Sequence, residues 1–101
     1  MCGIAGIFHL ETAKPVDPER VRRMAETLAH RGPDGAGVWT APGVGLGHRR
    51  LSVIDVAGGA QPMATADEAL VISHNGEIYN FAAIRAELEE RGHRFHTHSD
   101  T

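Results

Sequence analysis

The stretch MCGIAGIF, Met1–Phe8, decides how the rest of this chain is interpreted. From Gly3 to Phe8 small residues alternate with bulky apolar ones that favour strands, so we expect a short strand buried on at least one face. Cys2 lies at the head of that strand. Because it is the only cysteine among 101 residues, no internal disulfide can form, and the residue is either an inert small side chain or a reactive thiol.

Composition narrows the class of protein. The chain carries 10 basic and 13 acidic residues, a net charge of −3, so its composition lacks the excess of basic residues that is typical of nucleic-acid-binding proteins. Its apolar runs are far shorter than the roughly 20 residues that span a bilayer, and its start lacks the cationic segment of a signal peptide. We therefore expect a soluble, cytoplasmic protein that binds neither nucleic acid nor membranes.

A helix is predicted within the segment VDPERVRRMAETLAHRGPDG, residues 16–35. Asp17 is a good N-cap, and Pro18 suits the first helical position. Val16, just before the cap, is placed to pack back on the helix as a hydrophobic staple. The glycine and proline at residues 32–33 are expected to end it. The face predicted to be buried consists of Val21, Met24, Ala25 and Leu28.

Strand-like stretches follow the helix. Residues 36–40, 44–48 and 51–55 are separated by turn-forming residues, which favours a meander. Another apolar strand is expected at residues 69–74. The Asn-Gly pair at residues 75–76 is a strong turn signal directly after it.

A second helix is predicted to begin with Asn80 as its cap and to end at Gly92. The remaining residues, 93–101, resume an alternating strand pattern and stop without a closing element, so we expect the chain to be part of a longer protein. The expected staple of this helix is the pair Tyr79 and Ile84, and its inward side chains are Phe81, Ile84 and Leu88.

Removal of Met1 would give Cys2 a free α-amine. Reference pKa values are about 7.7–8.0 for an α-amine and about 8.5 for a thiol, so a base active near neutrality would be tethered to the nucleophile itself. The strand behind Cys2 would hold the pair rigidly, and Gly3 leaves room for a substrate. Considered alone, a cysteine near a terminus is more often a packing residue, and that alternative stays open.

Three other motifs have an ordinary structural explanation when each is taken alone. HRGPDG, residues 30–35, suits a helix end followed by a tight turn. NGE, residues 75–77, suits a turn, although the asparagine amide and an exposed N–H could also stabilise an oxyanion. Arg49 and Arg50 are either a solvated pair or clamps for a carboxylate.

Taken together, the motifs MCGIAGIF, HRGPDG, GHRRLSVID, GGAQPM, NGEIYNF and HSD follow an order and spacing that resemble the N-terminal glutaminase domain of the asparagine synthetase family. That domain is a class II glutamine amidotransferase and an N-terminal nucleophile hydrolase. The glucosamine-phosphate synthases share the Cys-Gly-Ile start but usually carry an arginine motif that ends in Trp-Ala-Thr-His. RRLSVID therefore favours the asparagine synthetase branch, and the resemblance covers essentially all of residues 1–101.

The resemblance implies an α+β fold, the four-layer α/β/β/α sandwich of N-terminal nucleophile hydrolases, with mostly antiparallel sheets. That fold needs a longer chain. Residues 1–101 are therefore expected to be the N-terminal part of a glutamine amidotransferase domain, with the sandwich incomplete and the synthetase domain absent. No cofactor is implied for this part, whereas ATP and magnesium are implied for the synthetase domain. A homodimer of the full-length protein is left open.

Site roles follow from the resemblance position by position. Cys2 would attack the side-chain amide of L-glutamine, with its own α-amine handling the proton, and form a γ-glutamyl thioester. Arg50 would grip the α-carboxylate and Asp100 the α-ammonium. Asn75 and Gly76 would form the oxyanion hole. The other substrate-binding positions that the resemblance implies are Leu51, Ser52, Val53, Ile54 and Glu77.

The implied activity is hydrolysis of glutamine to glutamate and ammonia, with the ammonia passed to an ATP-dependent synthetase domain of the same chain. Aspartate, amidated to asparagine, is the default acceptor, and a related carboxylate is the other option. The alternative is a truncated or degenerate module of the same fold that serves assembly or regulation without catalysis. Expressed alone, this part is expected to be inactive and poorly stable.

No metal site is expected. His96 and His98 would share one face of a strand, and His93 lies nearby, but no third ligand stands at a metal-like spacing. A solvated edge strand explains these histidines better.

Overall fold

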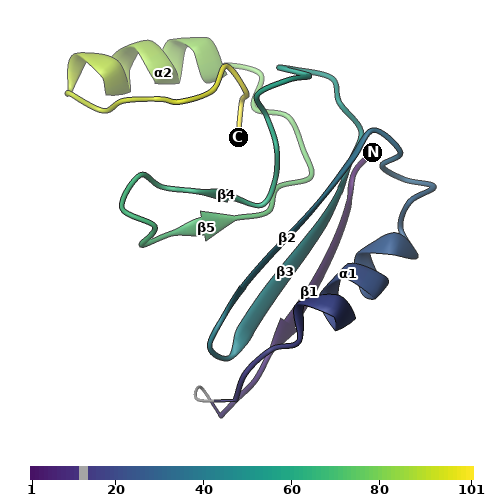
Figure 1. The fold of residues 1–101 in the computed structure, drawn as a ribbon. Helices are drawn as coiled ribbons and strands as arrows, with labels where there is room; N and C mark the ends of the chain where they lie inside the picture. The colour runs from purple at the N-terminus through teal and green to yellow at the C-terminus, as the bar shows by residue number, and fades with distance from the viewer. Residues whose placement is uncertain (12–13) are drawn as a thin grey trace.

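The computed structural model describes residues 1–11 and 14–101, which form helices and antiparallel sheets (Figure 1). The elements are β1 (Gly3–Phe8), α1 (Pro18–Glu26), β2 (Gly35–Ala41), β3 (Val44–Arg50), β4 (Met63–Ala64), β5 (Val71–Ile72) and α2 (Phe81–Glu90). The larger sheet has the strand order β1-β3-β2, so β3 lies in its centre. β4 and β5 make a smaller sheet, and the expected α+β class with antiparallel sheets is confirmed.

The register of the larger sheet brings the N-terminus beside the end of β3. Gly3 pairs with Arg49, and the sulfur of Cys2, the residue before Gly3, lies against the backbone of Leu51, the residue after β3. The strand predicted at Gly3–Phe8 is confirmed with the same bounds. β2 and β3 are also confirmed, each two residues longer than predicted.

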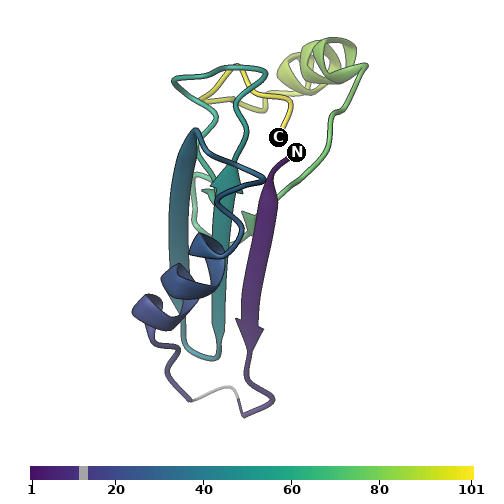
Figure 2. The ribbon, with the colours of Figure 1, turned by 90° about the vertical axis from the view of Figure 1, so that its right-hand side faces the viewer.

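Helix α1 covers one face of the larger sheet (Figure 2). Glycines on β3 allow this close approach, because a Cβ at Gly47 would lie 3.0 Å from the Ala25 Cβ and one at Gly45 would lie 2.8 Å from Val21 Cγ2. Val16, Val21 and Ala25 are the buried apolar side chains of the described residues. Full burial of a valine contributes roughly 1.5–3 kcal/mol, so this small cluster stabilises the helix against the sheet.

Helix α1 begins as predicted and ends early. The Asp17 carboxylate accepts a hydrogen bond from the Glu19 N–H at 3.0 Å, which confirms the N-cap. The helix ends at Glu26 rather than at residues 32–33, so the predicted end is wrong. Thr27 follows directly, and its hydroxyl donates to a carbonyl of the last helical turn at 2.7 Å, a local bond that competes with further helix.

The later strand predictions are wrong over most of their length. Residues 51–55 and 93–101 form no strand, and within 69–74 only Val71–Ile72 pairs, with β4. The first of these segments bends because the Arg50 guanidinium binds its carbonyl groups, which are then unavailable to a ladder. The last segment instead donates a backbone N–H to the carboxylate of Asp55 at 2.8 Å.

Helix α2 ends as predicted but begins without the predicted cap. Gly92 has a φ of 92°, and the N–H of His93 donates back to the last turn at 3.0 Å, a Schellman arrangement. The Asn80 side chain makes no capping hydrogen bond. Tyr79 is 93% exposed, so it does not pack on Ile84 as a staple. No helix in the described part of the chain is both long and apolar enough to cross a bilayer.

The sheet face opposite α1 is only partly covered, so the sandwich is incomplete in these residues. Gln61 approaches this face so closely that a Cβ at Gly37 would meet its carbonyl oxygen at 2.0 Å. Further along β1 no other part of residues 1–11 and 14–101 covers the apolar side chains on this face, since Ile4 is 42% exposed and Phe8 is 72% exposed. β1 is also an edge strand of the sheet.

We expect the isolated 101-residue chain to self-associate through this uncovered edge and face. Phe8→Thr should weaken the association about tenfold, since burial of a phenylalanine contributes roughly 1.5–3 kcal/mol. Leu10→Thr is the matched control, because Leu10 is 91% exposed and lies outside the sheet. Light scattering after size-exclusion chromatography, over a concentration series, measures the effect. A monomer that melts cooperatively at every concentration would contradict the expectation.

Candidate active site

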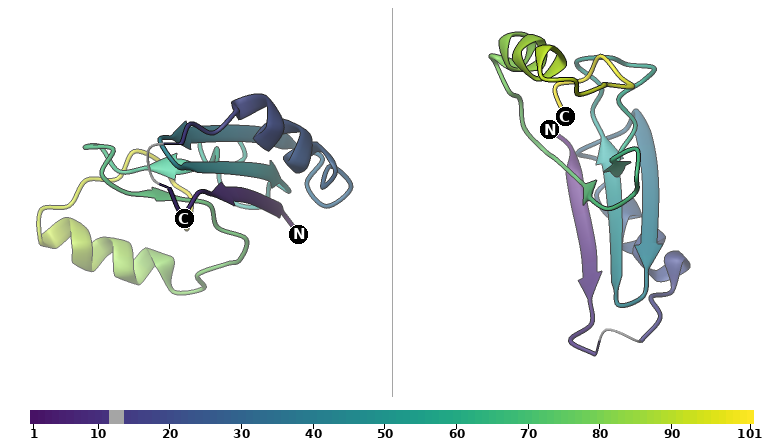
Figure 3. Two further views of the ribbon diagram at one scale, coloured as in Figure 1. Left: turned by 90° about the horizontal axis from the view of Figure 1, so that it is seen from below. Right: turned by 90° about the vertical axis from the view of Figure 1, so that its left-hand side faces the viewer.

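One cavity lies where the start of β1 meets the end of β3, and residues from both ends of the chain line it. Both termini lie at this end of the sheet (Figure 2 and Figure 3). The cavity volume of about 410 Å³ is within the roughly 300–1,000 Å³ of small-molecule sites. Of the predicted site residues, those that line the cavity are Cys2, Arg50, Leu51, Val53, Ile54, Asn75, Gly76, Glu77 and Asp100.

The Cys2 thiol lies against the backbone of Leu51. Its sulfur accepts the Leu51 N–H at 3.3 Å and donates to the Leu51 carbonyl oxygen at 3.7 Å. The Cys2 carbonyl accepts a hydrogen bond from Arg31 Nε at 3.0 Å. Cys2 is half-buried, so its sulfur is fixed by neighbouring backbone and is still reached from the cavity.

The motif HRGPDG, residues 30–35, does more than form a turn. Besides the Arg31 contact just described, the backbone N–H of Asp34 donates to the Arg50 carbonyl at 2.9 Å. The Asp34 carboxylate accepts the Ser52 N–H at 2.8 Å. The motif therefore holds both Cys2 and the chain that leaves β3, a role that the interpretation as a simple turn missed.

Gly32→Ala is expected to disrupt this support. A Cβ at Gly32 would lie 2.3 Å from the backbone carbonyl of Arg49, which cannot rotate away as a side chain can. The strain should lower the free energy of unfolding by about 1–3 kcal/mol, measured by urea titration. Gly35→Ala is the control, because its Cβ would meet only the Arg50 Cβ at 3.7 Å, an ordinary contact. Equal losses in the two variants would refute the argument from close approach.

The loop after β3 closes around the Arg50 guanidinium. Nη2 donates to the carbonyls of Ile54 and Asp55 at 2.8 and 2.7 Å, and Nη1 donates to that of Val56 at 3.0 Å. A Cβ at Gly59 would lie 2.4 Å from Nη2, so the loop needs glycine there. A guanidinium has five N–H donors, and these hydrogen bonds to backbone carbonyls within residues 1–11 and 14–101 occupy three of them.

Asp55 ties this loop to the C-terminal segment. Its carboxylate accepts the N–H groups of His98 at 2.8 Å and Gly58 at 2.9 Å. These two bonds, His98 first, hold the pKa of Asp55 below its usual range. Because the pKa is lowered on folding, the contact stabilises the folded state above about pH 4. This stabilisation is lost as the pH falls through the lowered pKa. Asp100 lies nearby in sequence, and its carboxylate accepts the Ile78 N–H at 2.8 Å.

Gln61, which sequence reasoning did not select, joins three segments around the cavity. Its side-chain oxygen accepts the His74 N–H at 2.6 Å, and its amide nitrogen donates to the Thr101 hydroxyl at 3.1 Å. His74 directly precedes Asn75, and Thr101 directly follows Asp100. One amide therefore supports both the predicted oxyanion position and the predicted acidic position. Its place in the GGAQPM motif is the signal that could have identified it.

Ser52 is the predicted site residue that the structure does not bring to this cavity. It lines a second cavity of about 180 Å³, which Arg50 also borders. The reason is local, because its N–H is held by the Asp34 carboxylate on the other side of the loop. The structure therefore places Ser52 beside the second cavity, and its substrate-binding role stays a prediction.

The histidines near the C-terminus lie on irregular backbone rather than on the predicted strand. His93, His96 and His98 are exposed. Across residues 1–11 and 14–101, no group of three or more His, Cys, Asp or Glu side chains could hold a metal ion.

The whole chain is similar to one family of domains. A family model described as a glutamine amidotransferase domain matches residues 1–101. Asparagine synthetase (glutamine-hydrolyzing) 1 of Bacillus subtilis (strain 168) is 46% identical over 103 residues, which cover 100% of this chain and 16% of the relative. Asparagine synthetase B of Escherichia coli (strain K12) is 39% identical over 100 residues, 99% of this chain and 18% of the relative. The chain thus spans about a sixth of the length of these relatives.

Proposed function

This chain belongs to the glutamine amidotransferase domain family, and from that premise we propose that its Cys2 hydrolyses the side-chain amide of L-glutamine. The observation that carries the proposal is the cavity lined by Cys2, Arg50, Asn75, Gly76 and Asp100. Such a reaction needs a nucleophile, a cation for the α-carboxylate, an anion for the α-ammonium and donors for an oxyanion. Cys2, Arg50 and Asp100 would meet the first three needs, and Asn75 and Gly76 together would meet the last.

The proposed reaction proceeds through a covalent intermediate on Cys2. After removal of Met1, the α-amine of Cys2 takes the thiol proton while the sulfur attacks the carboxamide carbon, and negative charge develops on the oxygen. The C–N bond then breaks, the proton passes to the leaving nitrogen, and ammonia departs from a γ-glutamyl thioester. Water hydrolyses the thioester, which releases glutamate and restores the thiol. The Leu51 N–H, 3.3 Å from the sulfur, supports this geometry by fixing the attacking atom.

Arg50 and Asp100 give the proposed site its preference for a free amino acid. The two guanidinium N–H groups of Arg50 that make none of those three backbone bonds would bind the α-carboxylate, and the Asp100 carboxylate lies in the wall of the same cavity. Burial of a charge costs free energy unless it is paired, so both charged ends of glutamine need these partners.

The proposal is tested with glutamine analogues that lack one charged end. N-acetyl-glutamine lacks the α-ammonium and keeps the α-carboxylate, whereas 4-aminobutanamide keeps the ammonium and lacks the α-carboxylate. Ammonia release from either should show a kcat/KM at least ~30-fold below that for glutamine, the equivalent of about 2 kcal/mol for a lost charged partner. The assay uses the protein as the cell makes it. Equal rates with glutamine and both analogues would rule out the proposed clamp.

The acceptor of the ammonia is proposed from the relatives. They are named asparagine synthetases, so we take aspartate as the acceptor and a related carboxylate as the second option. Activation of that carboxylate would require ATP and magnesium in a synthetase domain. The residues described here do not fit that role, because no cluster among them could hold a metal ion. A cytoplasmic location suits this function, since the thiol of Cys2 must stay reduced.

A further inference from the structure

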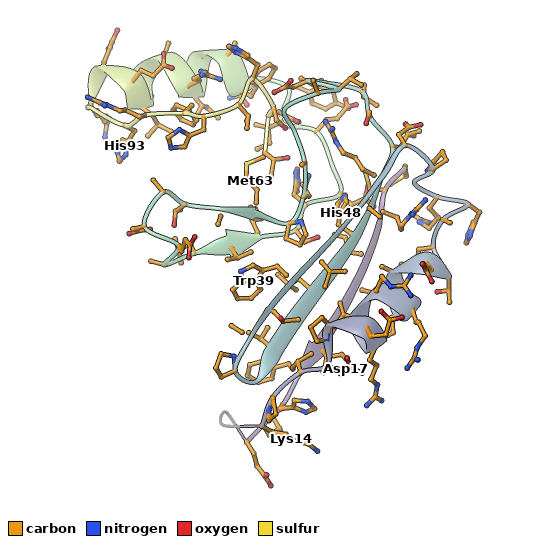
Figure 4. All side chains as sticks on the ribbon, viewed as in Figure 1. Lys14, Asp17, Trp39, His48, Met63 and His93 are labelled. Atoms are coloured by element: carbon orange, nitrogen blue, oxygen red, sulfur yellow. The ribbon has the colours of Figure 1, made fainter. Side chains whose placement is uncertain are left out.

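His48 is the largest fully buried side chain of the described residues, and the hydrolysis proposed above leaves it without a role. It lies in the middle of β3, where its ladder partners are Ile4 of β1 and Gly37 of β2. Its neighbour Gly47 faces α1, so His48 points to the opposite face of the sheet, toward β4 and β5 (Figure 4). A titratable side chain at 0% exposure in the centre of a sheet requires a reason.

The imidazole of His48 joins two segments that carry site residues. Its Nδ1 lies 2.8 Å from the hydroxyl oxygen of Ser73. Ser73 comes two residues before Asn75, and His48 comes two residues before Arg50. The bond is therefore a direct link between the strand that ends at the predicted clamp and the segment that contains the predicted oxyanion donors.

This link uses a neutral imidazole in one orientation. Nε2 is buried and has no hydrogen-bond partner within residues 1–11 and 14–101. Because an unpaired buried N–H is rarer than an unpaired acceptor, we assign the proton to Nδ1, which donates to Ser73. Burial first, and then the charges of Arg50 and His74, lower the pKa of His48 below its ordinary value. Protonation would add a charge facing Arg50 on its own strand and His74 after β5, so the neutral form persists at pH 7.

We propose that His48 is a positioning residue, which acts through Ser73 to place the oxyanion donors Asn75 and Gly76. The inference rests on the proposed function. The Gln61 side chain accepts the backbone N–H of the adjacent His74 at 2.6 Å, so side chains from β3 and from the loop before β4 fix the two residues that precede Asn75. A segment held in this way keeps its donors in place without reorganisation as charge develops.

The test compares kcat and KM for glutamine in the protein as the cell makes it. His48→Leu and Ser73→Ala should each lower kcat by about 10–100-fold, the scale expected for misplaced catalytic groups, with KM changed less than about threefold. His48→Asn should recover most of the loss, because its amide nitrogen replaces Nδ1. His96→Leu, the same exchange at an exposed histidine, should leave both constants unchanged. Ser73→Ala decides the question if His48→Leu does not fold.

Several outcomes overturn the inference. The double variant His48→Leu with Ser73→Ala should be no slower than the slower single variant, because both remove one hydrogen bond, and additive losses would contradict this. Unchanged kcat in both single variants, or His48→Asn as slow as His48→Leu, would also overturn it. If the wild type hydrolyses glutamine no faster than Cys2→Ala, the proposed function is refuted, and this inference is refuted with it. If the wild type is active and the His48 and Ser73 variants have the same kcat as the wild type, only this inference is refuted.

Discussion

Cys2→Ala is expected to lower the rate of glutamine hydrolysis by about 10⁴-fold or more, to the level left by binding alone. The variant keeps the cavity, the Arg50 side chain and residues 75–76, and it lacks only the sulfur that we propose forms the covalent intermediate. Loss of a nucleophile removes a whole reaction path, so this effect should exceed that of any other single substitution in the cavity. Release of both ammonia and glutamate, measured in one reaction mixture, gives the rate.

Two controls make the Cys2 experiment specific. The intact mass of the wild type reports whether Met1 has been removed, because a retained methionine would block the α-amine that we propose as the base. A diazoketone analogue of glutamine should add one equivalent of mass to the wild type and none to Cys2→Ala. Unchanged ammonia release in the variant would exclude Cys2 as nucleophile. Inactivity of both proteins would favour the non-catalytic module of the same fold.

Local sequence signals predicted those parts of the fold that are determined locally. The alternation behind Cys2 defines β1, and the Asp17-Pro18 pair defines the start of α1, because each needs only neighbouring residues to form. Residues 51–55 carry an equally good strand pattern and are not a strand. Three carbonyls after β3 bind the guanidinium of Arg50, and a side chain that captures backbone acceptors leaves no trace in hydrophobic periodicity.

The residues of the candidate site also differ in how well the sequence predicts them. Residues expected to contact substrate, such as Cys2 and Asp100, carry distinctive chemistry and stand in motifs, so the sequence could nominate them. The supporting roles of Arg31, Asp34 and Gln61 were harder to predict. The motifs HRGPDG and GGAQPM contain these residues, but their partners are backbone groups that lie 13 to 29 positions away in sequence. A backbone carbonyl or N–H is the same in every residue, and pairings of this kind depend on the folded register alone.

Asn75→Ala is expected to lower kcat by about 10²–10³-fold, with little change in KM. The Asn75 side chain is half-buried in the cavity wall, and its segment is fixed by the Gln61 contact to His74. An amide held in this way can donate to the oxygen of the tetrahedral intermediate, which carries far more charge than the ground-state carboxamide. Removal of the amide should therefore raise the free energy of the transition state and change the binding of glutamine only weakly.

The matched control for this prediction is Asn80→Ala. Asn80 lies five residues further along the chain, is exposed and makes no capping bond with its side chain, so its removal should change neither kcat nor KM. A large rise in KM for Asn75→Ala at constant kcat would mean that the amide holds bound glutamine rather than the developing oxyanion. The backbone N–H of Gly76 would then be the main donor, and removal of the Asn75 side chain would leave the chemical step intact.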